Sequence, residues 1–491
     1  MQIRIKRWVR GSAMLGTFTS ALVFSACTAG ISQQDYDSVQ ARFKEAETAS
    51  ANAQAQLQDK NRELASLTTP FKEWSQSWVR KAKTGSLKSN FEVKVLKTYE
   101  ESGRRLIDPS PGDLLVYVNT SNQNWGVVTR PNEDNTNKFS RVNVINARTK
   151  KLLGTMEMKD KPGRVHTSAV TPDGRYAYVP AGNDKDAVLF KVDALTLQPL
   201  KMLDVGGTIH HMQVFQDKYL LVDTFGMNSP GGRAAFLLDP ATDQIIGGIR
   251  TEALGGALYT VWPDPKQEYI YFLMEPADVP GTSAVFLTGR VDPGHYWVAK
   301  VDPKDWSVVR EYPYASYRSD WIQFSADGKY MYLDGSLDDS LVKMSLETGE
   351  VVWKTDVGTG PYGIELTADG KEVWVTDKGE SWKAHKGRTI TVIEEKTGKW
   401  LDTIVPGGRG IDHLTLSPNG KEMWATSNDS GTVYVVDVAT RQTIAEIPLP
   451  LFGDPHGVVF VHYNEQGTAR VVADQGDFRA GVDPRNGKAI Q

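Results

Sequence analysis

A short phrase recurs along this chain and limits what the chain can fold into. Each copy holds an apolar run, a turn of the Pro-Asp-Gly type and a second apolar run. The copies read HTSAVTPDGRYAYV from His166, DWIQFSADGKYMYL from Asp320, YGIELTADGKEVWV from Tyr362 and DHLTLSPNGKEMWA from Asp412. Two apolar runs joined by a tight turn indicate a β-hairpin. A period in the forties is typical of a β-propeller, in which each repeat is one blade.

The number of blades can be counted at two separate positions of the repeat. A strand-end phrase with a polar residue after an apolar one recurs seven times, at Asn146, Asp193, Asp239, Asp302, Ser345, Glu394 and Asp437. The innermost strands also start seven times, at His166, His210, Tyr259, Asp320, Tyr362, Asp412 and His456. Both counts predict an all-β, seven-bladed propeller over residues 113–491. The longest interval holds an insertion, expected at Glu275–Tyr296.

The two ends of the propeller are expected to meet in one blade. Its innermost strand would be residues 457–462, and its other strands would lie between residues 114 and 157. Such closure removes the free sheet edges that invite aggregation.

The N-terminal segment has the pattern of a targeting signal. A basic stretch, residues 4–10, precedes an apolar run at residues 13–24 that is too short for an ordinary transmembrane helix. The sequence Phe-Ser-Ala-Cys then ends at Cys27, the one cysteine of the chain. Residues 1–26 thus resemble a bacterial lipoprotein signal peptide. The resemblance implies lipidation of Cys27 and, since Thr28 follows, the periplasmic face of the outer membrane; a simple secretory signal is the alternative.

Residues 27–82 are expected to form a helical stalk. An apolar or small residue recurs at a spacing of three and four, at Tyr36, Val39, Phe43, Ala46, Ser50, Ala53, Leu57, Leu64 and Leu67. This heptad spacing predicts a coiled coil that joins copies of the chain into a homo-oligomer. A single amphipathic helix laid against the head is the alternative. Residues 83–112 form a polar connector with one strand-like run, residues 91–95.

Composition excludes several classes of function. The net charge is −4, so nothing in the charge favours a nucleic-acid partner. No Gly-x-Ser-x-Gly, P-loop or His-Glu-x-x-His motif occurs in residues 113–491. The absence of Cys-x-x-Cys-His excludes a covalent c-type haem.

The repeat resembles the YVTN-repeat and cytochrome d1-like propeller superfamily. Phrases such as PDGRYAYV and VYVVDVATRQTIAEI carry the resemblance, which covers most of residues 113–475. It implies a propeller fold and leaves the function open, because the same propeller serves many roles.

The first strand of each blade lines the channel of a propeller, so the seven strand starts should form a ring. Five of the eight histidines lie in or next to this ring. Imidazole and carboxylate ligands suit copper, zinc or iron. The expected metal ligands are His166, His210, His211, Asp320, His413 and His456, and the expected ligand-binding residues are Tyr259, Tyr362 and Asp412.

Resemblance to known propellers offers two cofactors for this ring. The His210-His211 pair resembles the paired histidines of copper centres in nitrous oxide reductases and thiocyanate dehydrogenases. A d1-type haem with His ligation is the second option. A ring without a cofactor, in which the side chains bond neighbouring blades or water, is an alternative, and an organic ligand is another. Asp320 and Asp412 are expected to act as a general acid–base pair if their carboxylates converge.

Two segments outside the ring carry weaker expectations. Glu275 is placed in the insertion, as part of a lid or an ordinary surface loop. Residues 378–386 are expected to be an exposed loop. The hypotheses for function are a lipid-anchored envelope protein that binds a metal or small ligand at the channel mouth, a periplasmic oxidoreductase with copper or a d1-type haem, and a docking platform without a cofactor.

Overall fold

The structure is a computed structural model of residues 1–491. It describes scattered positions between 34 and 52, then residues 85–121, 139–163, 166–182, 186–225, 233–275, 296–379 and 387–475, and four positions between 482 and 489. The chain divides into two units, Met1–Phe71 and Lys72–Gln491.

The first unit lies mostly outside the described residues. Its described positions between 34 and 52 are helical and almost all exposed. The signal peptide, Cys27 and all heptad positions of the stalk except Ala46 lie outside the described residues, so the lipid anchor and the coiled coil stay predictions. Within the described part of the chain, we find no helix with the length and apolarity needed to cross a bilayer.

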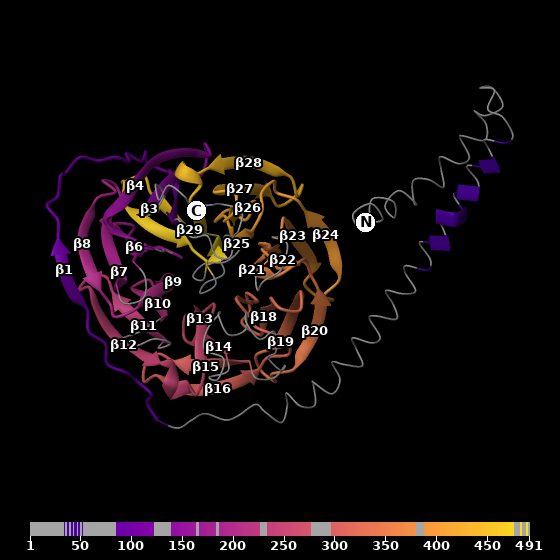
Figure 1. Ribbon diagram of the computed structural model, residues 1–491, viewed down its shortest axis with the longest axis horizontal. Coiled ribbons are helices and arrows are strands. Elements are labelled where there is room, and N and C mark those ends of the chain that lie inside the picture. Colours follow the sequence, from indigo (N-terminus) through magenta and orange to yellow (C-terminus); the bar gives the residue numbers. More distant parts are fainter. Residues whose placement is uncertain are drawn as a thin grey trace. The chain divides into compact units, whose positions relative to one another are not determined.

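The second unit is a propeller of seven antiparallel sheets around one axis (Figure 1). The first strands of the seven repeats are β29 (Asp454–Tyr463), β5 (Ala169–Val170), β9 (Thr208–Phe215), β13 (Ala257–Pro263), β17 (Ile322–Phe324), β21 (Pro361–Leu366) and β25 (Ile411–Leu416), in blades one to seven. All seven predicted strand starts lie on these strands or within three residues before them, which confirms the predicted seven blades.

Each blade continues outward through three more strands. The second strands are β2 (Leu114–Ser121), β6 (Tyr176–Ala181), β10 (Tyr219–Phe225), β14 (Ile270–Glu275), β18 (Tyr330–Gly335), β22 (Glu372–Asp377) and β26 (Glu422–Ser427). The third are β3 (Phe139–Asn146), β7 (Val188–Asp193), β11 (Arg233–Asp239), β15 (Trp297–Asp302), β19 (Ser340–Ser345), β23 (Thr389–Glu394) and β27 (Thr432–Asp437). The fourth are β4 (Lys151–Pro162), β8 (Pro199–Asp204), β12 (Gln244–Arg250), β16 (Ser307–Pro313), β20 (Val351–Asp356), β24 (Trp400–Ile404) and β28 (Thr443–Pro448). Every residue of the strand-end phrase is the last residue of a third strand.

The repeated turn has a simple chemical basis. In blade two the Thr171 hydroxyl donates to the Asp173 carboxylate, which also accepts the Arg175 backbone N–H. The next residue after Asp173 is Gly174, whose φ is 68°. Glycine adopts this left-handed conformation without the steric cost that other residues meet. Equivalent glycines at 328, 370 and 420 have φ of 67°, 64° and 70°, so the Pro-Asp-Gly phrase fixes the turn between first and second strands.

Blade one is built from both ends of the propeller, as predicted. The C-terminal strand β29 pairs with β2 over Leu114–Ser121, and β3 and β4 follow outward. In Figure 1 the yellow β29 lies among the purple strands of the N-terminal part. The Tyr117 and Tyr463 side chains from the two ends meet in the core, with their hydroxyls 3.4 Å apart.

Two strands add to the ring without belonging to a repeat. The strand β1 (Lys94–Thr98) pairs with β8 and extends blade two on its outer side, so the predicted connector contributes to the propeller. The strand β30 (Ala469–Ala473) pairs with β29 on the side away from β2, which faces the channel. A separate pair, β31 (Val482–Asp483) and β32 (Lys488–Ala489), and two short 3-10 helices, η2 (Thr251–Leu254) and η3 (Pro450–Phe452), complete the described elements.

The core lies between neighbouring blades. Trp424 of β26 packs edge-on against Phe460 of β29, with ring centroids 5.5 Å apart, and both are fully buried. Trp374 of β22 is equally buried. The tryptophans therefore act as packing groups between sheets, which holds the first strands at a fixed distance from the axis.

Candidate metal centre

The starts of the first strands bring five histidines together inside the channel. The His166 ring lies 4.3 Å from that of His210, 4.7 Å from His211, 5.5 Å from His413 and 4.0 Å from His456, measured between centroids. All five are buried, with His166 the most exposed at 7%. Segments far apart in the sequence thus supply one imidazole cluster.

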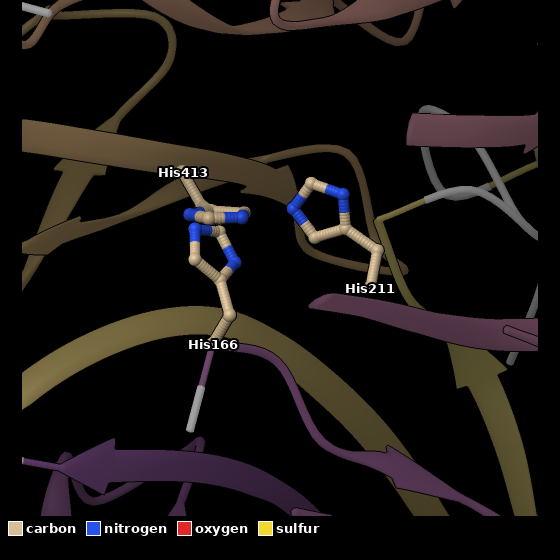
Figure 2. A group of neighbouring side chains, drawn as sticks. All are labelled: His166, His211 and His413. Atoms are coloured by element: carbon tan, nitrogen blue, oxygen red, sulfur yellow. The ribbon is translucent and has the colours of Figure 1, made fainter. Parts of the chain in front are cut away.

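Three of these histidines are arranged to hold a metal ion. One ring nitrogen from each of His166, His211 and His413 lies within 4.8 Å of the other two. Figure 2 shows the three rings side by side, carried by separate segments of the chain. The first residue precedes β5, the second is on β9 and the third on β25, so three different blades contribute.

The ring nitrogens that face away from this point are held by protein groups. His413 Nδ1 lies 2.9 Å from Asp412 Oδ2, and His211 Nδ1 lies 2.5 Å from the Thr260 hydroxyl. The Thr260 hydroxyl in turn donates to Asp223 Oδ2 over 2.8 Å. Histidines that ligate metals are commonly oriented through their second nitrogen in this way.

The opposite nitrogens have no such partner. His211 Nε2, His413 Nε2 and His166 Nδ1 are buried and lack a hydrogen-bond partner among the described residues. The Nε2 atom of His166 lies 3.4 Å from the Tyr362 hydroxyl. A buried polar atom without a partner costs free energy, so one such atom on each of three neighbouring rings calls for a bound group that satisfies them.

The protonation of the three histidines agrees with ligation. Burial, together with the neighbouring imidazoles, holds the pKa of His166 and of His211 well below the usual value. Burial also lowers the pKa of His413 to about 4, although Asp412 acts in the opposite direction. All three rings are neutral at pH 7, which is the form that binds a metal.

His456 lies in the same cluster but in a different environment. Its Nδ1 is 2.7 Å from Asp412 Oδ2, and its Nε2 is 3.2 Å from Asp454 Oδ1. Burial would lower the pKa of His456, but Asp454 and Asp412 raise it to about 9. Both of its nitrogens face carboxylates, so the ring is an imidazolium at pH 7. This predicted ligand therefore lies outside the group of His166, His211 and His413, and has metal-ligand spacing with Asp412 and His413 instead.

Asp412 connects the cluster to a buried cation. Its Oδ1 lies 2.9 Å from Lys378 Nζ, while its Oδ2 faces His413 and His456. Burial would raise the pKa of Asp412, but Lys378, His413 and His456 together hold it well below the usual value. The residue predicted to bind a ligand therefore orients two histidines.

Lys378 corrects one expectation from the sequence. Residues 378–386 were expected to form an exposed loop, but Lys378 is buried at 7% exposure and its ammonium lies 3.7 Å from the Tyr362 ring centroid. Residues 380–386 lie outside the described part of the chain.

His210 and its neighbours form the side of the cluster next to blade four. Its Nδ1 lies 3.0 Å from Asp223 Oδ1, and its ring stacks on Phe225 at 4.3 Å. Burial lowers the pKa of His210, and Asp223 counteracts the effect. Tyr259 lies 5.1 Å from the His210 ring, and its hydroxyl is 3.1 Å from that of Tyr362. Both predicted ligand-binding tyrosines therefore lie in the cluster.

Asp320 and Glu275 belong to a separate group of charges. Asp320 Oδ1 lies 2.8 Å from Arg318 Nε, and Glu275 lies 3.7 Å from the same atom and 3.8 Å from Arg233 Nη1. Among the described residues, none of the groups with metal-ligand geometry includes Asp320. Glu275 is the last residue of β14 and is 1% exposed, so its placement in an insertion loop was wrong. The charges of Arg233 and Arg318 balance that of the Glu275 carboxylate, which explains why this carboxylate is buried.

Asp223 and Thr260 are the important residues that the sequence reasoning missed. Asp223 accepts the backbone N–H of His211 and of Val261, in addition to the contacts above. A comparable residue, Asp334 of β18, accepts the backbone N–H of Asp320 over 2.9 Å. Both aspartates are the fifth residue of a second strand, after four mostly apolar residues. A polar residue at that repeat position is the signal that could have found Asp223.

Comparisons with known proteins agree with the fold. No family model matches the chain. Protein NirF of Pseudomonas aeruginosa is 23% identical over 353 residues, which are 60% of this chain and 83% of NirF. A solved structure from Bacteroides fragilis, assigned as a 6-phosphogluconolactonase, has a TM-score of 0.50 at 16% identity and covers 72% of this chain and 100% of its own. The dihydro-heme d1 dehydrogenase NirN in complex with DHE has a TM-score of 0.47 at 16% identity, covering 81% of this chain and 77% of its own. The chain is thus a seven-bladed β-propeller similar in sequence to NirF, in agreement with the resemblance of its repeat to cytochrome d1-like propellers.

Proposed function

We propose that this protein binds a transition-metal ion in its channel through His166, His211 and His413. Two observations carry the proposal: one nitrogen of each ring lies within 4.8 Å of the other two, and each of the three rings has a buried nitrogen without a partner among the described residues. The carboxylate behind His413 and the Thr260–Asp223 pair behind His211 support it, because such contacts fix the ring and raise its basicity as a ligand.

The donor set limits which ions fit. Neutral imidazoles suit zinc, copper, iron and nickel, whereas calcium and magnesium prefer oxygen ligands. Three protein ligands leave a fourth position for water or a small ligand, which is the pattern of catalytic rather than structural sites. With copper or iron in this position the protein would act as an oxidoreductase, and with zinc as a binding protein or hydrolytic enzyme.

Metal content of the purified protein tests the proposal. We expect about one ion per chain in protein purified without chelator, measured by elemental analysis. The triple variant His166→Ala, His211→Ala and His413→Ala should lose it while keeping its β-sheet circular dichroism. The matched control is His462→Ala, a partly buried histidine on β29 outside the cluster. Equal metal content in the triple variant and the wild type would refute the proposed site.

The resemblance of the repeat to cytochrome d1-like propellers favours a second candidate, a d1-type haem ligated by a histidine of the cluster. The geometry favours the metal ion. The centroids of neighbouring imidazole rings lie 4.0 to 5.6 Å apart, so the rings themselves fill the part of the channel that a haem would need. An absorption spectrum separates the two, since a haem absorbs strongly in the visible range and zinc does not. A docking platform without a cofactor is the third candidate, and it predicts neither metal nor chromophore.

We propose further that Cys27 anchors the protein to the membrane and that residues 27–82 space and oligomerise the head. The support is the lipoprotein-like sequence before Cys27 and the heptad spacing after it. The site would then lie in the envelope of a bacterium, on the periplasmic face.

A further inference from the structure

The C-terminal segment after the last blade enters the channel. The strand β30 lies on the channel side of β29, and its Val471 N–H donates to the Pro172 carbonyl of blade two over 3.0 Å. Asp474 Oδ2 then accepts the Val214 N–H of β9 over 2.8 Å, and the Gln475 carbonyl accepts the Trp262 indole N–H over 3.2 Å. The segment therefore crosses from blade one past blades two and three to blade four.

This path brings the Gln475 side chain next to the three histidines. Trp262, which holds the Gln475 backbone, lies 5.2 Å from the His211 ring, edge to face. A Cβ at Gly457 would lie 2.5 Å from Gln475 Oε1 and 3.6 Å from His413 Cδ2. Gln475 and His413 thus border the same small space, and a side chain at position 457 would fill it. A larger residue at position 457 would have to displace the Gln475 amide, which is the free end of a flexible side chain.

Within the described ranges of the chain, the side-chain amide of Gln475 has no hydrogen-bond partner. The residue is 4% exposed, and neither Oε1 nor Nε2 has a hydrogen-bond partner among the described residues. An amide can donate two hydrogen bonds and accept two, so leaving all of them unmade in the interior is costly. The Cδ2 atom of His413 that borders this space is bonded to the unpaired Nε2, so one bound group can reach both the amide and this imidazole.

We propose that Gln475 recognises the ligand in the fourth coordination position of the metal. This inference rests on the proposed metal site and adds the class of molecule that the site takes. The amide N–H groups donate to a small anion or to metal-bound water, and the amide oxygen accepts from a ligand that carries a proton. Gln475 is then a specificity-determining residue that no repeat of the propeller supplies.

Azide binding to copper(II)-loaded protein tests the assignment, because azide is a small anion whose binding to copper is visible by absorption. Gln475→Leu should keep the copper and weaken azide binding by roughly tenfold to a hundredfold, the usual effect of one hydrogen bond to a charged group. Gly457→Ala should weaken it in the same direction, since the added methyl displaces the amide. Gln466→Leu, in the exposed turn after β29, is the matched control and should change nothing.

The outcomes separate this inference from the proposed function. If the wild type binds no copper, the metal site itself fails. If all variants bind copper and azide like the wild type, the metal site stands and the role of Gln475 is overturned. Loss of copper from Gln475→Leu with an unchanged melting temperature would also overturn it, because Gln475 would then be a ligand of the metal.

Discussion

The substitution Asp412→Asn tests the electrostatic design of the site most directly. The carboxylate is fully buried and holds Lys378 at 2.9 Å, His456 at 2.7 Å and His413 at 2.9 Å. Asparagine is close in shape but carries no charge. The buried ammonium of Lys378 then loses its pairing with the Asp412 carboxylate. His456 keeps the Asp454 carboxylate but loses that of Asp412.

The expected loss follows from the burial of this network. Removing one partner of a buried ion pair costs about 3–5 kcal/mol, because the remaining charge stays desolvated. Such a loss is a large part of the roughly 5–15 kcal/mol that stabilises a typical domain. The variant should also bind metal about 10- to 100-fold more weakly, since His413 loses the carboxylate that orients it.

Urea unfolding followed by tryptophan fluorescence measures the first effect. The matched control is Asp369→Asn, because Asp369 forms an equally short pair with Lys371, at 2.8 Å, on the exposed surface. Exposed pairs contribute about 0–1 kcal/mol. An equal loss in the free energy of unfolding for both variants would contradict two claims: that the buried charges form one network, and that His456 is protonated.

Two further predictions concern other parts of the chain. Burial raises the pKa of Asp377 to about 7 despite hydrogen bonds from Thr389 and Thr391. Because the folded state holds this proton more tightly, the free energy of unfolding should fall between about pH 4 and pH 7, by roughly 4 kcal/mol from this group. Urea midpoints of Asp377→Asn should lack that part of the pH dependence, and a constant gap between variant and wild type would contradict the assignment. Replacement of Cys27 by serine should move the expressed protein from the detergent phase to the aqueous phase in Triton X-114 partition, and equal partition of both forms would rule out a lipid anchor.

The architecture could be predicted because the repeat has a local chemical cause. The hydroxyl of Thr171, the carboxylate of Asp173 and the left-handed Gly174 form a turn from adjacent residues, so the phrase itself marks each hairpin. The positions of the phrase then predict where the first strands start, which interval holds an insertion and that the two ends of the propeller close blade one. The same alignment of the repeats predicts that the histidines lie in or next to one ring.

The roles of the ring residues could not be predicted, because they depend on contacts between blades. His413 follows the ring position Asp412, and His456 is the next ring position. The two are the same residue type, yet the pKa of His413 is about 4 and that of His456 about 9. Asp454 beside His456 makes the difference, and nothing in a single repeat reveals it. The sequence around Lys378 is typical of a polar loop. Lys378 is nevertheless buried, because its ammonium pairs with the buried carboxylate of Asp412 in the next blade.

Gln475 escaped detection for a different reason. It follows β30, which belongs to no repeat, so no alignment of blades could place it at the axis. Only the antiparallel pairing of β30 with β29 shows that the chain turns inward there.

The closure of blade one has a consequence for the order of folding. Tyr117 and Tyr463 meet although they are 346 residues apart, so the ring cannot close until almost the whole chain has been made. Contacts of such long sequence separation form slowly, because the entropy of a large loop must be lost first. His456 and Gln475 arrive with this last step. A nascent or truncated chain would hold His166, His211 and His413 on separate blades without a closed channel, so metal uptake should mark the completion of folding.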